Sequence, residues 1–236
     1  MNIIYLHGLS SSGNSNTAHR IKELFPEDNV IAPDLPVNPF DALKLIDNIL
    51  KPLPVNDTVV LGTSMGGMFA QQQAPYRRIL VNPAFHVSTL LRVNIGKKLP
   101  FFSQRQDGAT EFEVTEELCR QYEEMESKQF DKNNNAKNVI GLFGKYDETV
   151  NCKPEYLDHY SLYHDFEGGH RMNNDVIENV LVPVLTFLHK PGYAFDGSVD
   201  ANGVRLQYNN HGYTAIHQIH SQRQSLQCCI DRSIES

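Results

Sequence analysis

Short apolar runs alternate with segments of helical periodicity along residues 1–190, and this alternation restricts the possible folds more than any other feature of the chain. The apolar runs, each predicted to be a strand, cover residues 2–6, 29–32, 58–62, 78–81, 139–143 and 161–166. Helices are predicted over residues 18–25 and 40–50, from the third run through Gln73, and over residues 176–188. Strands that alternate with helices build βαβ units. The sequence therefore predicts a three-layer α/β fold, in which a mostly parallel sheet carries helices on both faces.

The alternation stops in residues 82–138, directly after the fourth predicted strand. One amphipathic helix is predicted there, because Val114, Leu118, Tyr122 and Met125 share a helical face behind a Thr115 cap. We interpret this segment as a small insertion that forms a lid or a substrate pocket. Its apolar side chains, which either line an acyl pocket or pack in the core, include Leu90, Leu91, Phe101, Phe102 and Phe112.

After residue 190 the composition becomes polar, with many Gln, Asn, Ser and His residues and few large aliphatic ones. Such a segment buries little apolar surface. We therefore expect one domain over residues 1–190, followed by a polar C-terminal tail over residues 191–236. Asn202-Gly203 favours a short hairpin within this tail, and the sequence leaves open whether the tail is ordered or disordered.

The charge balance limits the partners of the chain. The 28 acidic and 21 basic side chains give a formal net charge of −7. A chain with this balance offers no electrostatic footprint for nucleic acid or for an anionic membrane surface. An acidic run on the helix of the insertion is predicted to face solvent and comprises Glu116, Glu117, Glu123, Glu124 and Glu126.

Other sequence features concern location and cofactors. We find no secretory signal pattern and no apolar run near the ~18 residues that span a bilayer. The four cysteines, Cys119, Cys152, Cys228 and Cys229, have neither a metal-ligand spacing nor the pattern of a disulfide framework. We therefore expect a cytoplasmic protein with reduced thiols and without a membrane span, a metal or a cofactor.

The third apolar run leads directly into Gly62-Thr63-Ser64-Met65-Gly66, which matches the pattern G-x-S-x-G. Between a strand and a helix, this pattern forms a sharp turn that exposes the serine hydroxyl at the carboxyl edge of the sheet. Small residues are needed two positions before and after the serine, because larger side chains would collide there. We predict that Ser64 is a nucleophile; the alternative is that Ser64 only caps the following helix.

A serine nucleophile that attacks a carbonyl needs N–H groups to bind the oxyanion that develops. Met65 begins the predicted helix, where N–H groups lack helical partners, so its N–H is one predicted donor. The predicted second donor is the N–H of Leu9, which follows Gly8 in the loop after the first strand. For His7 we favour a structural role, in which the ring binds backbone and orders this loop, over proton transfer.

The Ser64 hydroxyl also needs a base that accepts its proton. His170 follows the last predicted strand of the sheet, and the preceding Gly168 and Gly169 let the loop turn back over the sheet edge. We therefore predict His170 as the base, and an ordinary loop histidine is the alternative. The competing histidines are His159, His164, His211, His217 and His220.

The imidazole needs an acid that orients it, and in hydrolases with this serine turn the acid lies between the serine and the histidine along the chain. Asp147 follows a predicted strand and loop and precedes His170. We predict Asp147 as the acid. Glu148 and Asp165 are its rivals, and the alternative for Asp147 is a solvated loop carboxylate.

Together these motifs resemble the α/β-hydrolases and are similar to the YqiA-like family of small bacterial esterases. The resemblance rests on residues 7–12, 32–36, 62–67 and 168–170, and it covers most of residues 1–190. It implies hydrolysis of carboxylic esters or acyl thioesters by a cytoplasmic monomer or small homo-oligomer without a cofactor. Beyond residue 190 the resemblance ends, and the insertion diverges from the family, so the substrate stays open.

The residues and the resemblance predict a serine esterase that cleaves a small-molecule acyl ester or thioester through Ser64, His170 and Asp147. An acyltransferase or a peptidase on the same fold would use the same three residues. A non-catalytic small-molecule binding protein is the alternative from another class, although a binding protein needs none of the three. A metal enzyme is least favoured, because no histidine or carboxylate cluster has the spacing of metal ligands.

Overall fold

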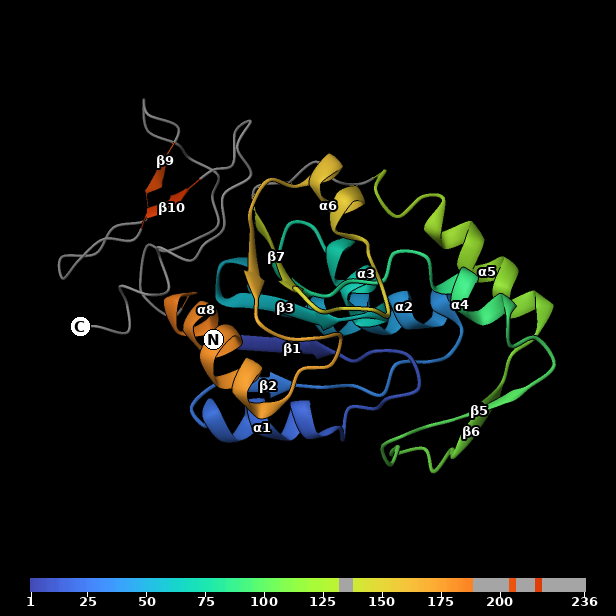
Figure 1. Cartoon of the computed structure of the whole chain (residues 1–236). Helices are drawn as coiled ribbons and strands as arrows, with labels where there is room; N and C mark the ends of the chain where they lie inside the picture. Colours follow the sequence, from blue (N-terminus) through green and yellow to red (C-terminus); the bar gives the residue numbers. More distant parts are fainter. Residues whose placement is uncertain (132–137, 189–203, 207–214, 218–236) are drawn as a thin grey trace.

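The computed structural model describes residues 1–131, 138–188, 204–206 and 215–217, and a sheet of six strands forms its centre (Figure 1). The strands are Asn2–Leu6 (β1), Asn29–Ile31 (β2), Thr58–Thr63 (β3), Arg77–Val81 (β4), Val139–Gly144 (β7) and Tyr163–Phe166 (β8). They lie in the order β2-β1-β3-β4-β7-β8, and every neighbouring pair is parallel. All six predicted strands are therefore present, and the predicted parallel sheet is confirmed.

The strand order determines where a site can form. From β1 the chain moves to β2 on one side, and the later strands continue from β3 on the other side. Loops that follow β1 and β3 therefore diverge, and in open α/β sheets this switch point leaves a crevice at the carboxyl edge. The serine turn follows β3, so Ser64 lies at this edge.

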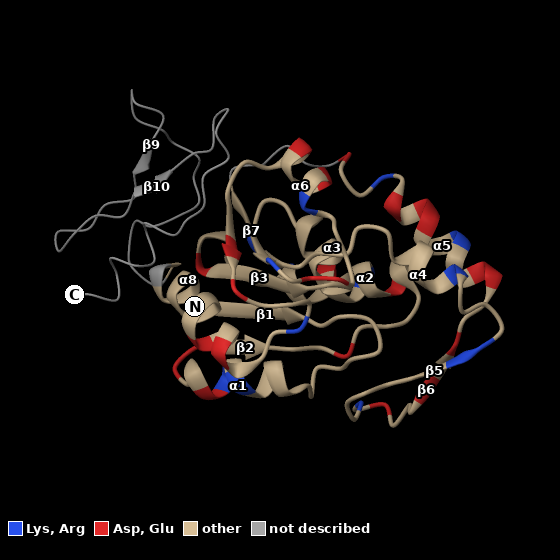
Figure 2. Ribbon diagram, in the orientation of Figure 1, with Lys and Arg blue, Asp and Glu red and all other residues tan. Residues whose placement is uncertain are grey.

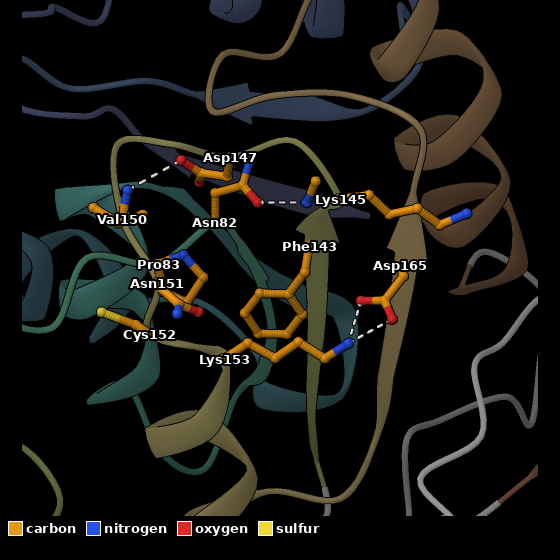
Figure 3. Close-up of a pocket in the computed structure, with 11 residues that line it drawn as sticks. Asn82, Pro83, Phe143, Lys145, Asp147, Val150, Asn151, Cys152, Lys153 and Asp165 are labelled. Atoms are coloured by element: carbon orange, nitrogen blue, oxygen red, sulfur yellow. Dashed lines mark hydrogen bonds and ion pairs between the residues drawn. The ribbon is translucent and has the colours of Figure 1, made fainter.

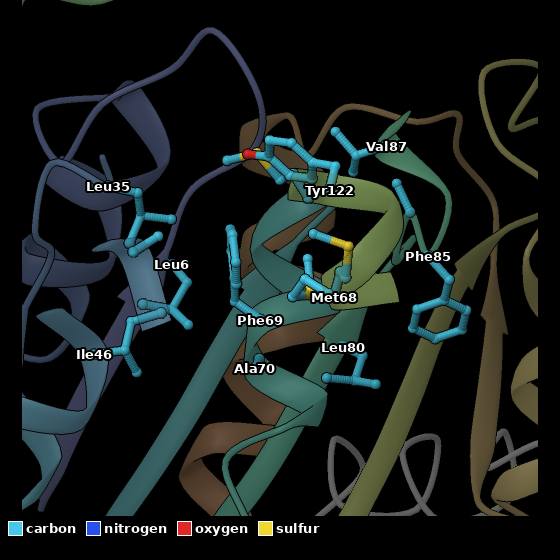
Figure 4. Close-up of a cluster of buried hydrophobic side chains, with 14 of the residues drawn as sticks. Leu6, Leu35, Ile46, Met68, Phe69, Ala70, Leu80, Phe85, Val87 and Tyr122 are labelled. Carbon is cyan, nitrogen blue, oxygen red and sulfur yellow. The ribbon is translucent and has the colours of Figure 1, made fainter. Parts of the chain in front are cut away.

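Helices cover both faces of the sheet. Alternate strand residues point to opposite faces, so Ile3 and Tyr5 belong to one buried cluster and Ile4 and Leu6 to the other. The first face is covered by α1 (Asn16–Leu24), α7 (Asn174–Val176), the π-helical turn Ile177–Leu181 and α8 (Val182–Leu188). The second face is covered by α2 (Pro39–Leu50), α3 (Met65–Gln71) and α6 (Lys153–His159). The predicted three layers are confirmed, and Figure 4 shows part of the core on the second face.

Capping side chains explain where the first two helices begin. The hydroxyl of Ser15 accepts a hydrogen bond from the N–H of Ala18, over 3.3 Å. The side-chain oxygen of Asn38 accepts hydrogen bonds from the N–H groups of Phe40 and Asp41. Pro39 takes the first helical position, where its missing N–H costs no hydrogen bond. Both helices therefore begin slightly before the predicted periodic segments, and a 3₁₀ turn, Val55–Asp57, precedes β3.

The insertion lies between β4 and β7. It contains α4 (Val87–Arg92), β5 (Lys98–Pro100), β6 (Glu111–Glu113) and α5 (Glu116–Glu126). The α5 helix confirms the helix predicted there: Thr115 caps it, and the predicted apolar face is buried. The antiparallel β5–β6 hairpin projects away from the central sheet (Figure 1). The sequence pattern predicts neither α4 nor this hairpin, because its strands of three residues are too short to show alternation.

The five apolar side chains singled out in the insertion divide between core and surface. Leu91 and Phe112 are buried, and Phe101 is partly buried. Leu90 is exposed, and Phe102 exposes 72% of its surface. Core packing therefore accounts for Leu91 and Phe112, whereas the exposed ring of Phe102 is open to another role.

Acidic residues are frequent along α5 (Figure 2). Glu116, Glu117 and Glu124 are exposed there, as predicted. Glu126 differs, because its carboxylate accepts hydrogen bonds from the backbone N–H of Ser88 and from its hydroxyl, over 2.8 and 2.5 Å. Burial raises the pKa of Glu126 above the usual range of a glutamate. This residue therefore joins α5 to α4 instead of only facing solvent.

In the tail, Val204–Leu206 (β9) and Ala215–His217 (β10) pair as antiparallel strands. Asn202 and Gly203, where the sequence predicts a hairpin turn, lie outside the described residues. Among the helices that the structure describes, none combines the length and the apolar character needed to cross a bilayer.

Candidate functional site

Ser64 lies in a strained turn between β3 and α3. Its backbone angles are φ 54° and ψ −121°, in a region that residues other than glycine rarely adopt. The flanking glycines make the turn possible: a Cβ on Gly62 would lie 2.1 Å from the carbonyl oxygen of Gly66, and a Cβ on Gly66 would lie 2.0 Å from that of Leu6. The G-x-S-x-G spacing is therefore explained by direct contact of backbones around the serine.

Two hydrogen bonds link Ser64, His170 and Asp147 in a row. Nε2 of His170 lies 2.9 Å from Oγ of Ser64, and Nδ1 of the same ring lies 2.8 Å from Oδ2 of Asp147. Because a carboxylate only accepts hydrogen bonds, Nδ1 carries the proton, and Nε2 of the neutral ring is left to accept from the Ser64 hydroxyl. The structure thus brings together the three residues that the sequence analysis selected from distant segments.

The backbone holds the Asp147 carboxylate in place. Its second oxygen, Oδ1, accepts hydrogen bonds from the N–H groups of Thr149 and Val150, over 2.8 and 3.0 Å. The Asp147 side chain is 6% exposed and that of His170 is 18% exposed. An oriented and largely buried carboxylate of this kind fixes the tautomer of the imidazole that it binds.

Asn82 is a site residue that the sequence analysis missed. It follows β4, and its side-chain N–H₂ donates to the carbonyl oxygens of Gly169 and His170, over 3.0 and 3.1 Å. Its side-chain oxygen accepts from the N–H of Gly144 at the end of β7, over 2.8 Å. Asn82 therefore joins the loop of His170 to the strand that leads to Asp147. An asparagine directly after a buried strand, at the edge where Ser64 lies, is the sequence signal that points to it.

The rival residues lie elsewhere or have other partners. The ring of His159 stacks on Phe130 with the ring centres 3.7 Å apart, and His164 is buried within β8. Asp165 forms an ion pair with Lys153, and Glu148 is exposed. The structure describes no side chain for His211, His217 or His220.

The loop after β1 lies directly against the serine. A Cβ on Gly8 would be 3.3 Å from Cβ of Ser64, so Leu9 follows a residue that lies against the serine. Met65 is the first residue of α3, where an N–H has no acceptor within the helix. The two predicted N–H donors thus belong to two segments that adjoin Ser64, the loop after β1 and the start of α3.

His7 has the structural role that the sequence analysis favoured. Nε2 accepts a hydrogen bond from the N–H of Leu35 over 3.0 Å, so Nδ1 carries the proton and donates to the carbonyl oxygen of Gly8 over 2.8 Å. Burial lowers the pKa of His7 to about 4, which keeps the ring neutral. Because the Gly8 carbonyl and the Leu9 N–H belong to one planar peptide group, His7 also orients the Leu9 N–H.

A cleft of about 400 Å³ lies beside Asp147 (Figure 3). Residues that line it include Asn82, Asp147, Cys152, Lys153 and Asp165, but neither Ser64 nor His170 does. Burial raises the pKa of the Cys152 thiol, which disfavours the reactive thiolate. Within the described residues, no group of three or more His, Cys, Asp or Glu side chains is arranged to hold a metal ion.

Solved structures of several hydrolases are similar to this chain. Est1E from Butyrivibrio proteoclasticus is 17% identical, with 80% of this chain and 88% of that one covered and a TM-score of 0.55. The S-formylglutathione hydrolase FrmB from Staphylococcus aureus is 15% identical, with 80% and 84% covered and a TM-score of 0.55. Alpha/beta hydrolase domain-containing protein 10 from mouse is 16% identical, with 80% and 89% covered and a TM-score of 0.54. At these identities the comparisons show the fold, which is that of the α/β-hydrolases.

A family model matches most of the chain. The model of an uncharacterised protein family, UPF0227, matches residues 2–189, which include every described strand of the central sheet and the three hydrogen-bonded residues of the site. This chain of 236 residues therefore belongs to the uncharacterised protein family UPF0227 and has the α/β-hydrolase fold.

Proposed function

We propose that this protein is a serine hydrolase that cleaves carboxylic esters or acyl thioesters through a covalent acyl-enzyme on Ser64. The observation that carries the proposal is the row of hydrogen bonds from Ser64 through His170 to Asp147, with the serine on a strained turn. A serine that only capped α3 would need neither bond, and it makes no side-chain cap there. The hydrolase fold supports the proposal, and structures similar to this chain include an S-formylglutathione hydrolase from Staphylococcus aureus and a thioesterase domain from the curacin biosynthetic pathway.

In the proposed reaction, Oγ of Ser64 attacks the acyl carbon while Nε2 of His170 takes its proton. Asp147 holds the ring and stabilises the imidazolium that forms. The negative oxygen of the tetrahedral intermediate accepts hydrogen bonds from the N–H groups of Leu9 and Met65. His170 then gives its proton to the leaving alcohol or thiol, and the acyl group stays on Ser64.

Water completes the proposed cycle. Nε2 of His170, again neutral, takes a proton from a water molecule that attacks the acyl carbon. The second tetrahedral intermediate collapses, the carboxylic acid leaves, and the Ser64 hydroxyl recovers its proton. If an alcohol or amine resolved the acyl-enzyme in place of water, the protein would be an acyltransferase with the same residues.

The test is hydrolysis of p-nitrophenyl esters of increasing acyl length and of one acyl thioester, by the wild type and by Ser64→Ala. We expect hydrolysis by the wild type and none by the folded variant, and the optimum length then defines the acyl group. Equal hydrolysis by both proteins would refute the proposal. Binding of an ester without turnover would favour a non-catalytic binding protein. The cytoplasmic location and the monomer or small homo-oligomer remain predictions from the sequence.

A further inference from the structure

The loop after β1, residues 7–14, is joined to the tip of the β5–β6 hairpin, residues 101–110. The carbonyl oxygen of Ser10 accepts a hydrogen bond from the N–H of Phe102 over 2.8 Å. The hydroxyl of Ser12 donates to the carbonyl oxygen of Gln104 over 2.9 Å. Because Leu9 lies beside Ser10, the hairpin tip is connected to the loop that carries one proposed oxyanion donor.

Asp34 connects the same two segments through one carboxylate. Oδ1 accepts a hydrogen bond from the N–H of Gly13 over 2.7 Å, and Oδ2 accepts one from the N–H of Gln106 over 2.6 Å. Hydrogen bonds from N–H groups to a carboxylate are stronger than those between neutral groups. One carboxylate oxygen therefore binds the loop after β1, and the other binds the hairpin tip.

The residue after Asp34 is held in the same way. The N–H of Leu35 donates to His7 in the loop after β1, while its carbonyl oxygen accepts from Nη1 of Arg105 at the hairpin tip, over 3.1 Å. Arg105 is 6% exposed, and its guanidinium lies over the ring of Phe101 with 4.5 Å to the ring centre. Asp34 and Leu35 therefore lie between the loop and the hairpin tip and bind both.

We infer that Asp34 is a positioning residue that couples the β5–β6 hairpin to the loop after β1 and thereby sets the position of the Leu9 N–H. The inference rests on the proposed function, since the position of Leu9 affects turnover only if an oxyanion forms beside it. In this inference the hairpin holds the loop that carries the Leu9 N–H in place, in addition to any role as a lid. Asp34 belongs to residues 32–36, a motif that the proposed mechanism leaves without a task.

The first experiment compares Asp34→Ala and Asp34→Asn with the wild type, using the p-nitrophenyl ester that the wild type hydrolyses best. A misplacement of about 1 Å costs up to ~100-fold in rate, so we expect kcat of Asp34→Ala to fall by roughly 10- to 100-fold with little change in KM. Asp34→Asn keeps one acceptor oxygen, so its kcat is expected to lie between that of Asp34→Ala and that of the wild type.

A second readout separates positioning from a general loss of structure. An alkylboronic acid forms a tetrahedral adduct with an active serine, and one of its oxygens takes the place of the oxyanion. Its inhibition constant should rise for Asp34→Ala by the same factor by which kcat/KM falls. A residue that only helped the chain fold would reduce the amount of active protein and leave this inhibition constant unchanged.

Asp28→Ala is the matched control. Asp28 forms an ion pair with the Met1 amino group over 2.7 Å, at the end of β1 that lies away from the loop, and its side chain is 6% exposed. Its replacement removes a buried carboxylate without touching the loop after β1, so the wild-type kcat and boronic acid inhibition constant are expected. If Asp34→Ala does not fold, Ser12→Ala removes the bond to Gln104 and should show a smaller, parallel change in both constants.

The outcomes distinguish the inference from the function on which it rests. If the wild type hydrolyses esters in a Ser64-dependent manner while Asp34→Asn and Ser12→Ala keep both wild-type constants, the coupling is refuted and the proposed function stands. A fall in kcat without a matching rise in the inhibition constant also refutes the coupling. If the wild type neither hydrolyses esters nor binds the boronic acid, the proposed function fails, and the inference fails with it.

Discussion

The side-chain amide of Asn82 donates a hydrogen bond to the carbonyl oxygen of His170 over 3.1 Å, while the oxygen of the same amide accepts from the N–H of Gly144. One side chain at the end of β4 thus connects the loop of His170 to the strand that leads to Asp147. Asn82 also has a positive φ of 44°, a conformation that asparagine tolerates better than most residues.

Replacing Asn82 should slow turnover without abolishing it. In Asn82→Gly the backbone keeps its conformation but both loops lose their bonds, and we expect kcat to fall by roughly 10- to 100-fold, as for other small displacements in active sites. Asn82→Ala should show a similar kcat and an additional loss of about 1 kcal/mol in the free energy of unfolding, because alanine disfavours positive φ. Ester hydrolysis and urea unfolding of both variants test this; wild-type kcat in Asn82→Gly would contradict it.

Most of the fold could be predicted because its signals are local. Each strand of the central sheet is a short apolar run, and α1, α2 and α5 carry an apolar face of helical period. The sequence pattern does not predict α6, because this helix has seven residues, with Pro154 near its start and Tyr156 as its only fully buried side chain. The order of the strands depends on long-range pairing, which no local pattern encodes.

The site was predictable to the extent that motifs define it. Ser64 follows from the spacing of its glycines, and Asp147 and His170 follow from their places after strands and in the chain order. The hydrogen-bond partners of Asn82 and Asp34 could not be predicted, because they lie 62 or more residues away for Asn82 and 72 residues away for one oxygen of Asp34. Hydrogen bonds between distant loops leave no spacing in the sequence.

Replacing Asp147, the proposed acid, should lower kcat far more than replacing the neighbouring Glu148. Asp147→Asn keeps the shape of the side chain but offers the imidazole an amide, which favours the wrong tautomer, and by analogy with other serine enzymes kcat should fall on the order of 10,000-fold. The exposed Glu148 is the matched control, and Glu148→Gln should keep the wild-type kcat. Ester hydrolysis at neutral pH tests both variants. A large loss of kcat in Glu148→Gln, or no loss in Asp147→Asn, would contradict the assignment of Asp147 as the acid.

The exposed ring of Phe102 should affect substrate choice and not stability. Its neighbours connect it to the site: its N–H binds Ser10, and the guanidinium of Arg171, next to His170, lies 5.9 Å from the ring centre. Phe102→Ala should therefore alter the dependence of kcat/KM on acyl length. The free energy of unfolding should change by less than about 0.5 kcal/mol. The buried Phe112 is the control, because Phe112→Ala should cost about 3–5 kcal/mol in stability. An unchanged acyl-length profile in Phe102→Ala would remove Phe102 from the substrate site.

The buried His7 makes the folded state sensitive to acid. Its pKa falls from 6.5 to about 4 on burial, so between these values the unfolded chain binds a proton that the folded chain excludes. The contribution of His7 to the free energy of unfolding is therefore fully present above pH 6.5. It is lost as pH falls toward 4, by up to about 1.4 kcal/mol per pH unit. His7→Asn should be less stable at neutral pH but should lose less stability on acidification. Parallel pH profiles of unfolding for the two proteins would contradict this assignment.

The most direct test of the central claim is covalent labelling of Ser64 by a fluorophosphonate, located by mass spectrometry of the digested protein. We expect one adduct, on the peptide that contains Ser64, formed rapidly by the wild type, slowly by Asp147→Asn and not at all by Ser64→Ala. Labelling that persists in Ser64→Ala, or a folded wild type that gives no adduct, would contradict an activated serine at this site.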